Sequence, residues 1–389
     1  MPEYTIPLSV PKISGNEWQY IKECLDTEWV SSAGKYVDLF EEKIAEYTGA
    51  KYAISCVNGT SALQVAMRLA GVAPGDEVIV PTLTFIAPVN AISYNGARPV
   101  FMDADDYYNL DLDKTIEFTK NETVFKDGFT YNKISKKRIS AIVPVHVWGN
   151  ACWLDELISI CKERNISIIE DASESLGTVY NSGKNKGLHT GTVGRLGCLS
   201  FNGNKIITTG GGGMILTNDE ELAEKARYLT TQAKDDPVRY IHHEIGYNFR
   251  LTNIQSALGV AQLEQLPGFL KRKREFYRQY VEAVETIEGL SMATAPDYAE
   301  NNHWMNLLHI DSNTYGEKRE ALIYRMEGNG IQIRPVWALN HLQKSYQECQ
   351  AYRIEKASEL VKKSLCLPSS TNLSDEDILQ LLNYLVSKE

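Results

Sequence analysis

Short apolar runs rich in Val and Ile alternate with amphipathic stretches between residues 51 and 230. The short runs predict strands, whereas apolar positions that recur every three or four residues predict helices. Strands are expected at residues 51–57, 77–80, 98–102, 139–145, 166–170 and 214–216, and helices at residues 61–70, 85–94, 154–164 and 219–229. Strands and helices that alternate in this way form a parallel sheet covered by helices.

The pattern becomes helical after residue 252. The stretch TNIQSALGVAQLEQL is apolar at helical spacing, and FLKRKREFYRQYVEAVETI continues it as a charged amphipathic helix. Beyond it, the expected elements are strands near residues 306–310 and 331–334 and helices at residues 317–328 and 374–386. We therefore predict a large domain at residues 1–250, and a linker helix with a small C-terminal α+β domain at residues 251–389.

Residues 119–138, TKNETVFKDGFTYNKISKKR, interrupt the alternation. They are polar, rich in lysine and without clear periodicity. We expect an exposed insertion before the strand at residue 139.

Length and composition indicate an ordinary globular protein. The 389 residues suffice for roughly two domains, because single cores rarely grow beyond about 250 to 300 residues. The hydrophobic content of 43% and the aromatic content of 10% argue against disorder. A net charge of -10 argues against a broad nucleic-acid surface, since such surfaces neutralise phosphates with lysine and arginine, but it leaves room for a local basic pocket.

The seven cysteines are scattered, with no CxxC pair and no cysteine and histidine cluster at zinc spacing. We therefore expect reduced, buried thiols and no metal site. The N-terminal residues MPEYTIPLSVPK contain an early glutamate and no long apolar run, so neither a signal peptide nor a membrane span is predicted. The cytoplasm is the expected compartment.

The stretch SFNGNKIITTGGGG, residues 200–213, combines a lysine with four consecutive glycines. It does not fit a P-loop, because Gly203 is followed by Asn204, Lys205 and Ile206 and the glycines come after the lysine. A dinucleotide fingerprint that begins at Gly210 would need glycine where Ile215 stands. The lysine therefore has another role, and the glycines are expected to shape a tight turn beneath a cofactor.

Lys205 follows Ser200 by five residues, at the end of an apolar strand around Leu199. A lysine in this place can form a Schiff base while the serine binds phosphate, although most single lysines are solvated surface charges. The run IIEDASESLG ends a strand with Asp171, which either holds a protonated ring nitrogen or caps a helix.

Two further stretches follow predicted strands. In VNGTSAL, Thr60 and Ser61 start a helix, where backbone N–H groups favour a phosphate; a plain helix cap is the alternative. In PTLTFIAP, Phe85 either stacks on a flat ring or belongs to the core.

The motifs NGTSAL, PTLTFIA, RPVFMD, PVHVWGN, IEDASESLG, LSFNGNK, GGGGM and GYNFRLTNIQSALG follow one another along essentially the whole chain. In this order they resemble the sugar aminotransferases of the DegT/DnrJ/EryC1/StrS type, which have the fold type I of the pyridoxal phosphate enzymes. The resemblance implies an α/β fold. In it, a large domain with a mostly parallel seven-stranded sheet between helices precedes a small C-terminal α+β domain.

The resemblance also implies roles for individual residues. Lys205 matches the Schiff-base lysine and Asp171 the partner of the pyridine nitrogen of pyridoxal 5'-phosphate. Further cofactor contacts are implied for Thr60, Ser61 and Ser200 at the phosphate, for Phe85 against the ring, and for Asn248, which reaches the phosphate from a neighbouring subunit. The implied protein is a homodimer with shared active sites, and its cofactor alternates with pyridoxamine phosphate.

Glu174 departs from the family pattern, which usually has glutamine or histidine near the cofactor's 3′-oxygen. A carboxylate beside this oxygen is unfavourable unless one of the two carries a proton, so we hypothesise that Glu174 shares a proton with cofactor or substrate. Glu174, the NGNKIITT run and TTQAK resemble the branch that acts on UDP-4-keto-6-deoxy-N-acetylglucosamine in the bacillosamine and legionaminic acid routes. The insertion at residues 119–138 favours the legionaminic type.

The implied reaction moves the amino group of L-glutamate to a nucleotide-linked 4-keto-6-deoxy sugar, with UDP-4-keto-6-deoxy-N-acetylglucosamine as the expected acceptor. The alternative is another nucleotide keto-sugar, GDP- or dTDP-linked, aminated at C3 or C4. Arg334, His242 and Arg250 are candidates for substrate contacts, with structural or surface roles as the alternative. Three other functions are possible alternatives. The first is a sugar dehydratase, a type of family member in which histidine replaces the lysine. The second is an inert cofactor-binding or regulatory protein, and the third is a nucleotide hydrolase. Lys205 argues against the dehydratase, and the failed P-loop argues against the hydrolase.

Overall fold

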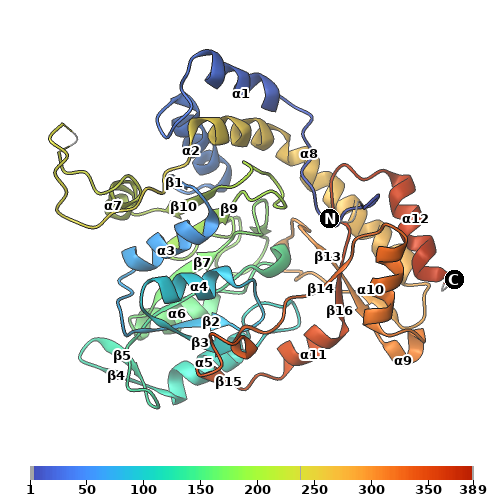
Figure 1. The fold of residues 1–389 in the computed structure, drawn as a ribbon. Coiled ribbons are helices and arrows are strands. Elements are labelled where there is room, and N and C mark those ends of the chain that lie inside the picture. Colours follow the sequence, from blue (N-terminus) through green and yellow to red (C-terminus); the bar gives the residue numbers. More distant parts are fainter. Residues whose placement is uncertain (1–3, 237, 388–389) are drawn as a thin grey trace.

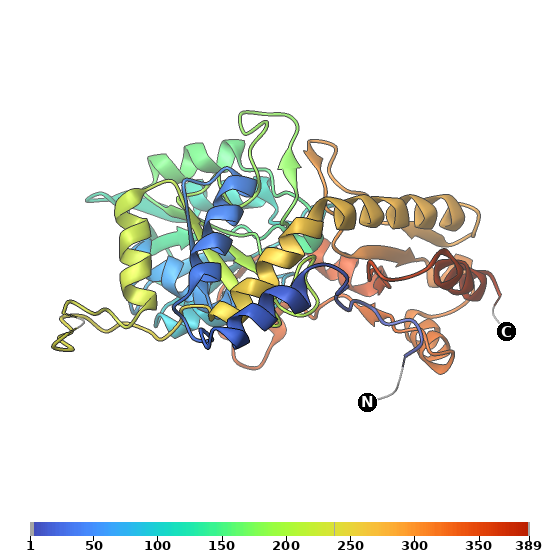
Figure 2. The same ribbon diagram turned by 90° about the horizontal axis from the view of Figure 1, so that it is seen from above.

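The protein has two lobes joined by a long helix, as shown by a computed structural model that describes residues 4–236 and 238–387 (Figure 1). Seen from above, helix α8 runs from the larger lobe into the smaller one (Figure 2). Residues 1–3 and 388–389, the ends of the two predicted domains, lie outside the described residues. All seven cysteines are free thiols, as expected, and only Cys349 is not buried.

The larger lobe is built on an eight-stranded sheet. In spatial order its strands are β1 (Tyr52–Cys56), β10 (Gly213–Thr217), β9 (Leu196–Ser200), β7 (Ser167–Asp171), β6 (Ile139–Ile142), β2 (Glu77–Pro81), β3 (Arg98–Met102) and β15 (Ala351–Tyr352). The pairs from β9 to β15 are parallel, and β10 is antiparallel to both of its neighbours. The mostly parallel sheet expected from the sequence is confirmed.

The eighth strand, β15, corrects the expected seven-stranded sheet. It comes from the C-terminal half of the chain and pairs with the edge of β3, where the Phe101 N–H donates to the Gln350 carbonyl at 2.8 Å. A strand of two residues is too short to show periodicity, so the sequence pattern does not reveal it.

Helices cover both faces of this sheet (Figure 1). Because successive side chains of a strand point to opposite faces, Val78 and Val80 of β2 lie in a core shared with α3 and α4, while Ile79 lies in a second core with α5 and α6. The helices of the larger lobe are α1 (Glu17–Asp26), α2 (Lys35–Thr48), α3 (Gly59–Leu69), α4 (Ala87–Tyr94), α5 (Leu112–Asn121), α6 (Asp155–Glu163) and α7 (Glu220–Thr230), with a 3-10 turn at Val147–Gly149.

The exposed insertion expected at residues 119–138 contains a β-hairpin, which the sequence analysis did not predict. Its strands are β4 (Thr123–Lys126) and β5 (Phe129–Asn132), joined by Asp127 and Gly128 with φ values of 52° and 81°. Asp-Gly is a strong hairpin signal, because both residues of this tight turn need positive φ. The signal was present in the sequence, but the surrounding lysines obscured the short alternation.

Helix α8 (Asn253–Val284) is the predicted linker, and it continues through Pro267. Its second half packs Phe276 and Tyr280 into the core of the smaller lobe. That lobe contains a four-stranded antiparallel sheet in the order β11 (Leu290–Met292), β13 (Asn306–Ile310), β16 (Ser364–Leu367) and β14 (Arg334–Pro335). Its other elements are α9 (Ser312–Tyr315), α10 (Arg319–Gly328), α11 (Lys356–Lys363) and α12 (Asp375–Val386), with a 3-10 turn at Asn340–Leu342.

The two lobes are fastened to each other at several points. Strand β8 (Val179–Tyr180) of the larger lobe pairs with β12 (Ala299–Glu300), which follows α8. The buried carboxylate of Asp103, just after β3, accepts hydrogen bonds from the backbone N–H groups of Lys356 and Ala357 at the start of α11. These contacts keep the smaller lobe against the edge of the sheet at which the parallel strands end.

Within residues 4–236 and 238–387, no helix combines the length and the apolar character needed to cross a membrane.

Candidate active site

A cavity of about 660 Å³ lies between the two lobes. Asp171 at the end of β7 and Ser200 at the end of β9 line it, together with the first turn of α3. The smaller lobe contributes Trp304 and Arg334. The cavity therefore lies at the carboxyl ends of parallel strands, where open α/β sheets bind their ligands.

Lys205 points into this cavity with only 12% of its side chain exposed. Its Nζ atom lies 3.4 Å from Oε1 of Glu174 and 4.2 Å from the centroid of the Trp304 ring. The amine is thus held between a carboxyl group and an aromatic face. This is the environment of a functional amine, and the alternative of a solvated surface lysine is wrong.

Asp171 is 4% exposed, and its Oδ1 atom accepts a hydrogen bond from the Ser173 N–H at 3.1 Å. Burial raises the pKa of Asp171 above its ordinary value, although the Ser173 hydrogen bond and the charge of Lys205 act in the opposite direction. A cationic partner inside the cavity would therefore stabilise the anionic form of this buried carboxyl group.

Glu174 is 5% exposed and accepts a hydrogen bond from the Trp148 N–H at 2.8 Å through Oε2. Burial raises the pKa of Glu174 to about 7, and the nearby Lys205 ammonium partly opposes this rise. The carboxyl group therefore exchanges its proton near neutral pH.

Glu170 precedes Asp171 but serves the fold. Its side chain, on the opposite face of β7, is fully buried and accepts backbone N–H groups of residues 191, 193 and 194. His146 Nε2 lies 2.9 Å from Glu170 Oε2, and its Nδ1 atom accepts the Cys152 N–H, so Nε2 carries the proton. Both ring nitrogens of His146 are therefore hydrogen-bonded within the fold, away from the cavity.

The first turn of α3 forms the polar end of the cavity. Asn58 caps the helix by accepting the Ser61 N–H at 2.7 Å, and Gly59, Thr60 and Ser200 line the cavity beside it. Ser61 itself is 8% exposed and is not among the lining residues. Free N–H groups and the helix dipole make such a turn suited to a phosphate group.

The glycine run lies behind this turn and not beneath the cavity, which corrects the role expected for it. None of its members is a lining residue. A Cβ atom on Gly213 would lie 2.5 Å from the backbone carbonyl of Asn58, so glycine lets β10 approach the start of α3 closely. Only Gly210 has a positive φ, at 78°. The run thus positions the phosphate end indirectly.

Four aromatic side chains form a wall of the cavity. The Trp148 ring stacks on Trp337 with centroids 3.7 Å apart, and Trp304 lies 5.8 Å from Trp148. Phe85, which is 52% exposed, packs against Trp337 at 5.9 Å. The three tryptophans were not singled out from the sequence, because two of them come from the smaller lobe and none belongs to a short motif with chemical meaning.

Besides Ser61, three predicted residues do not line the cavity. Nδ1 of His242 lies 2.8 Å from the Gln232 carbonyl, Arg250 forms an ion pair with Asp38 at 3.1 Å, and Asn248 is exposed. All three belong to the segment between α7 and α8, which extends away from the body of the chain (Figure 1). Arg334, in contrast, lines the cavity and is half exposed.

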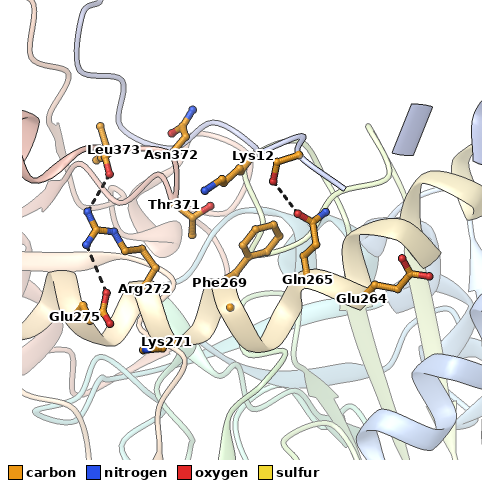
Figure 3. A pocket seen from close by; sticks show the side chains of 12 residues that line it. Lys12, Glu264, Gln265, Phe269, Lys271, Arg272, Glu275, Thr371, Asn372 and Leu373 are labelled. Carbon is orange, nitrogen blue, oxygen red and sulfur yellow. Dashed lines mark hydrogen bonds and ion pairs between the residues drawn. The ribbon is translucent and has the colours of Figure 1, made fainter. Parts of the chain in front are cut away.

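A second cavity, of about 720 Å³, lies beside α8 (Figure 3). Several of its polar groups pair with one another or with the backbone: Arg272 donates to the Leu373 carbonyl and to Glu275, and Ser14 donates to Gln265 (Figure 3). These contacts join α8 to the N-terminal segment and to residue 373 of the smaller lobe.

Residues 11–386 match the model of the DegT/DnrJ/EryC1/StrS aminotransferase family. The chain belongs to this family. Its members are aminotransferases that use pyridoxal phosphate, and the fold type I expected from the sequence is confirmed.

Individual relatives of this family cover nearly the whole chain. The protein EpsN of Bacillus subtilis (strain 168), named as a pyridoxal phosphate-dependent aminotransferase, is 37% identical over 98% of this chain and 95% of its own. The GDP-perosamine synthase of Caulobacter vibrioides is 36% identical over 96% of this chain and 95% of its own. The crystal structure of DesI with its TDP-sugar product has a TM-score of 0.86 at 26% identity, covering 99% and 92% of the two chains.

The cavity fits the family's cofactor. The amine of Lys205, the carboxyl group of Asp171 and the helix turn at Thr60 share one cavity and can serve an aldehyde, a ring nitrogen and a phosphate. In addition, the buried Oδ1 atom of Asn204, another lining residue, has no hydrogen-bond partner among the described residues. The cavity volume is that of a site for a cofactor together with part of a substrate.

Proposed function

We propose that this pyridoxal phosphate-dependent aminotransferase moves the amino group of L-glutamate to C4 of UDP-4-keto-6-deoxy-N-acetylglucosamine. The observation that carries the proposal is the Lys205 amine, buried between Glu174 and Trp304 in a cavity that also contains Asp171. The acetamido sugar is supported by the apolar wall of three tryptophans, against which a methyl group can pack. A place in legionaminic acid or bacillosamine synthesis, and a cytoplasmic location, stay predictions.

In this proposal the chain supplies position and proton transfer. The cofactor contributes an electron-withdrawing ring that delocalises the electrons released from the substrate's α-carbon. Lys205 binds the cofactor aldehyde and, once released, moves the substrate proton. Asp171 keeps the ring nitrogen protonated, and Thr60 and Ser200 hold the phosphate with the first turn of α3. Phe85 and the tryptophans exclude water from the reacting atoms, and Arg334 contacts an anionic part of donor or acceptor.

We also propose a homodimer that shares its active sites. The segment between α7 and α8 exposes Val238, Tyr240 and Ile245 at 83%, 75% and 79%. Exposed apolar side chains on a projecting segment indicate a protein contact. A second copy would cover them and bring Asn248 to its phosphate site. Sedimentation at several concentrations tests this, and a monomer at working concentration would contradict it.

The substrate test is a comparison of amino acceptors with the purified protein. We expect a yellow protein whose visible absorption changes to that of the amine form when L-glutamate is added. The amine form should then be reoxidised by UDP-4-keto-6-deoxy-N-acetylglucosamine at least about tenfold faster than by GDP-4-keto-6-deoxymannose, since one well-placed group contributes about 1 to 3 kcal/mol to discrimination.

The other outcomes distinguish the alternatives. A preference for the GDP-linked sugar would place the protein with the GDP-perosamine synthases, two of which are 36% and 37% identical to it. Bound cofactor without a reaction with glutamate would indicate a regulatory protein. Loss of a sugar hydroxyl without amination would indicate a dehydratase.

Replacement of Glu174 should remove a titration from the active site. The carboxyl group gains its proton as the pH falls below about 7, its shifted pKa, and becomes a hydrogen-bond donor to the cofactor's oxygen. In Glu174→Gln the amide donates at every pH. We therefore expect the absorption and the glutamate half-reaction of the wild-type protein to change between about pH 6 and pH 8, and those of the variant to stay constant there.

Glu156→Gln is the control for this prediction, because Glu156 is exposed and bonds only Trp153 among the described contacts. It should behave like the wild-type protein. If Glu174→Gln keeps the wild-type spectrum, rate and pH profile, Glu174 shares no proton with the cofactor or substrate.

A further inference from the structure

Trp304 is fixed in position by hydrogen bonds of both its backbone and its side chain. Its N–H donates to Asn302 Oδ1 at 2.9 Å, and its indole N–H donates to the Asn204 carbonyl at 2.7 Å. Its carbonyl accepts hydrogen bonds from Lys273 and from Ser369 Oγ, each at 2.9 Å. Four hydrogen bonds therefore fix the backbone and side chain of Trp304, and three of them come from distant segments of the chain.

Lys273 is the unusual member of this set. The ion pairs among residues 4–236 and 238–387 do not include it, and its side chain is 3% exposed. Burial lowers the pKa of Lys273 to about 7. Its Nζ atom donates to the carbonyls of Trp304 and Ser369 and to Ser369 Oγ. Burial of a lysine is unfavourable unless its amine is hydrogen-bonded. Here the three hydrogen bonds of the Lys273 amine go to Trp304 and to Ser369, which itself donates to the Trp304 carbonyl.

The ring that is fixed in this way contacts the reactive lysine and the residue before it. Lys205 Nζ lies over its face at 4.2 Å from the centroid, within the range of a cation–π interaction. The indole N–H donates to the carbonyl of Asn204, the residue immediately before Lys205. The same indole ring thus locates the backbone next to Lys205 and the amine at the end of its side chain.

We infer that Trp304 is a positioning residue that holds the free amine of Lys205 between its indole face and Glu174 whenever the lysine is not bonded to the cofactor. The catalytic consequence rests on the proposed function: a lysine that must leave the cofactor and then move a proton benefits from a fixed resting place. Besides Lys205, the charged residues that line the cavity between the lobes are Glu174 and Asp171 from the larger lobe and Arg334 from the smaller one. The indole face is the neutral member of this set.

The contact can be measured without turnover. Reductive ¹³C-methylation labels Lys205, and Lys205→Ala identifies its resonance. Methyl groups above an indole face are shifted upfield by the ring current. We expect this upfield shift in the pyridoxamine phosphate form and in the full chain freed of cofactor. Trp304→Phe should keep a large part of it, because an aromatic face remains, and Trp304→Leu should abolish it.

Kinetics provide the second readout. Trp304→Leu should lower kcat about tenfold with little change in KM for glutamate, and Trp304→Phe should lower it clearly less. Trp153→Leu is the control, because Trp153 packs on Tyr298 and is not among the lining residues of the cavity. Equal Lys205 shifts in wild-type protein and Trp304→Leu, or equal losses of kcat in both Trp304 variants, would overturn the inference.

The two proposals can fail separately. A protein that binds no cofactor but shows the shifted Lys205 signal would retain the contact and refute the proposed function. A yellow, active protein without the shift would retain the function and refute the role of Trp304.

Discussion

Replacement of Lys205 by alanine should abolish turnover and the covalent attachment of the cofactor together. Two contributions disappear at once, since the same amine binds the cofactor aldehyde and moves the substrate proton. General acid and base groups alone contribute about 10² to 10⁴ in rate, so we expect the glutamate half-reaction to slow by about 10⁴-fold or more. Stopped-flow absorption after mixing with L-glutamate measures this directly.

Two variants distinguish the contributions of this lysine. Lys205→Arg keeps a positive charge beside Glu174 but cannot bind the aldehyde, so it should be as inactive as the alanine variant. Lys51→Ala, at an exposed position outside the cavity, should have wild-type rates. Substantial half-reaction rates in Lys205→Ala, with yellow colour that survives gel filtration, would show that another amine binds the cofactor.

Four residues predicted from short motifs, Thr60, Asp171, Ser200 and Lys205, line the same cavity. Each lies at or just after the end of a strand of the large sheet, and the carboxyl ends of these strands meet at one edge. Alternation and motif order therefore predicted a common site. The same reasoning distinguished Asp171, at the end of a strand, from ordinary acidic residues on the surface. The burial of Asp171 agrees with this distinction.

The tryptophans that the smaller lobe contributes could not be found in this way, although Arg334 of that lobe was named as a candidate. Trp304 contacts Asn204 across 100 positions of sequence, and the residues around it, NHWM, match no motif. Local periodicity says nothing about which distant segments meet. Strand β15 was missed for the same reason, because its place is fixed by pairing with β3 and not by its own two residues. The cavity therefore has one wall that sequence predicted and one that only the packing of the lobes creates.

Replacement of Asp171 by alanine should have the second-largest effect on activity. Asp171 is buried, and burial raises its pKa, so a cationic partner in the cavity stabilises its anionic form. A protonated ring nitrogen supplies this cation. Removal of one partner of a buried ion pair costs about 3 to 5 kcal/mol, which corresponds to about a 10²- to 10⁴-fold slower half-reaction.

A cofactor analogue tests whether Asp171 acts through this charge. Methylation of the ring nitrogen makes its positive charge permanent, so the ring no longer needs a carboxylate to remain cationic. In Asp171→Ala, we expect the half-reaction to be much faster with the N-methyl analogue than with the ordinary cofactor. In the wild-type protein, the analogue should not increase the rate. Equal slowness of the variant with either cofactor would mean that Asp171 fixes the position of the ring, and Ser173, whose N–H binds the same carboxyl group, would then be the residue to examine with it.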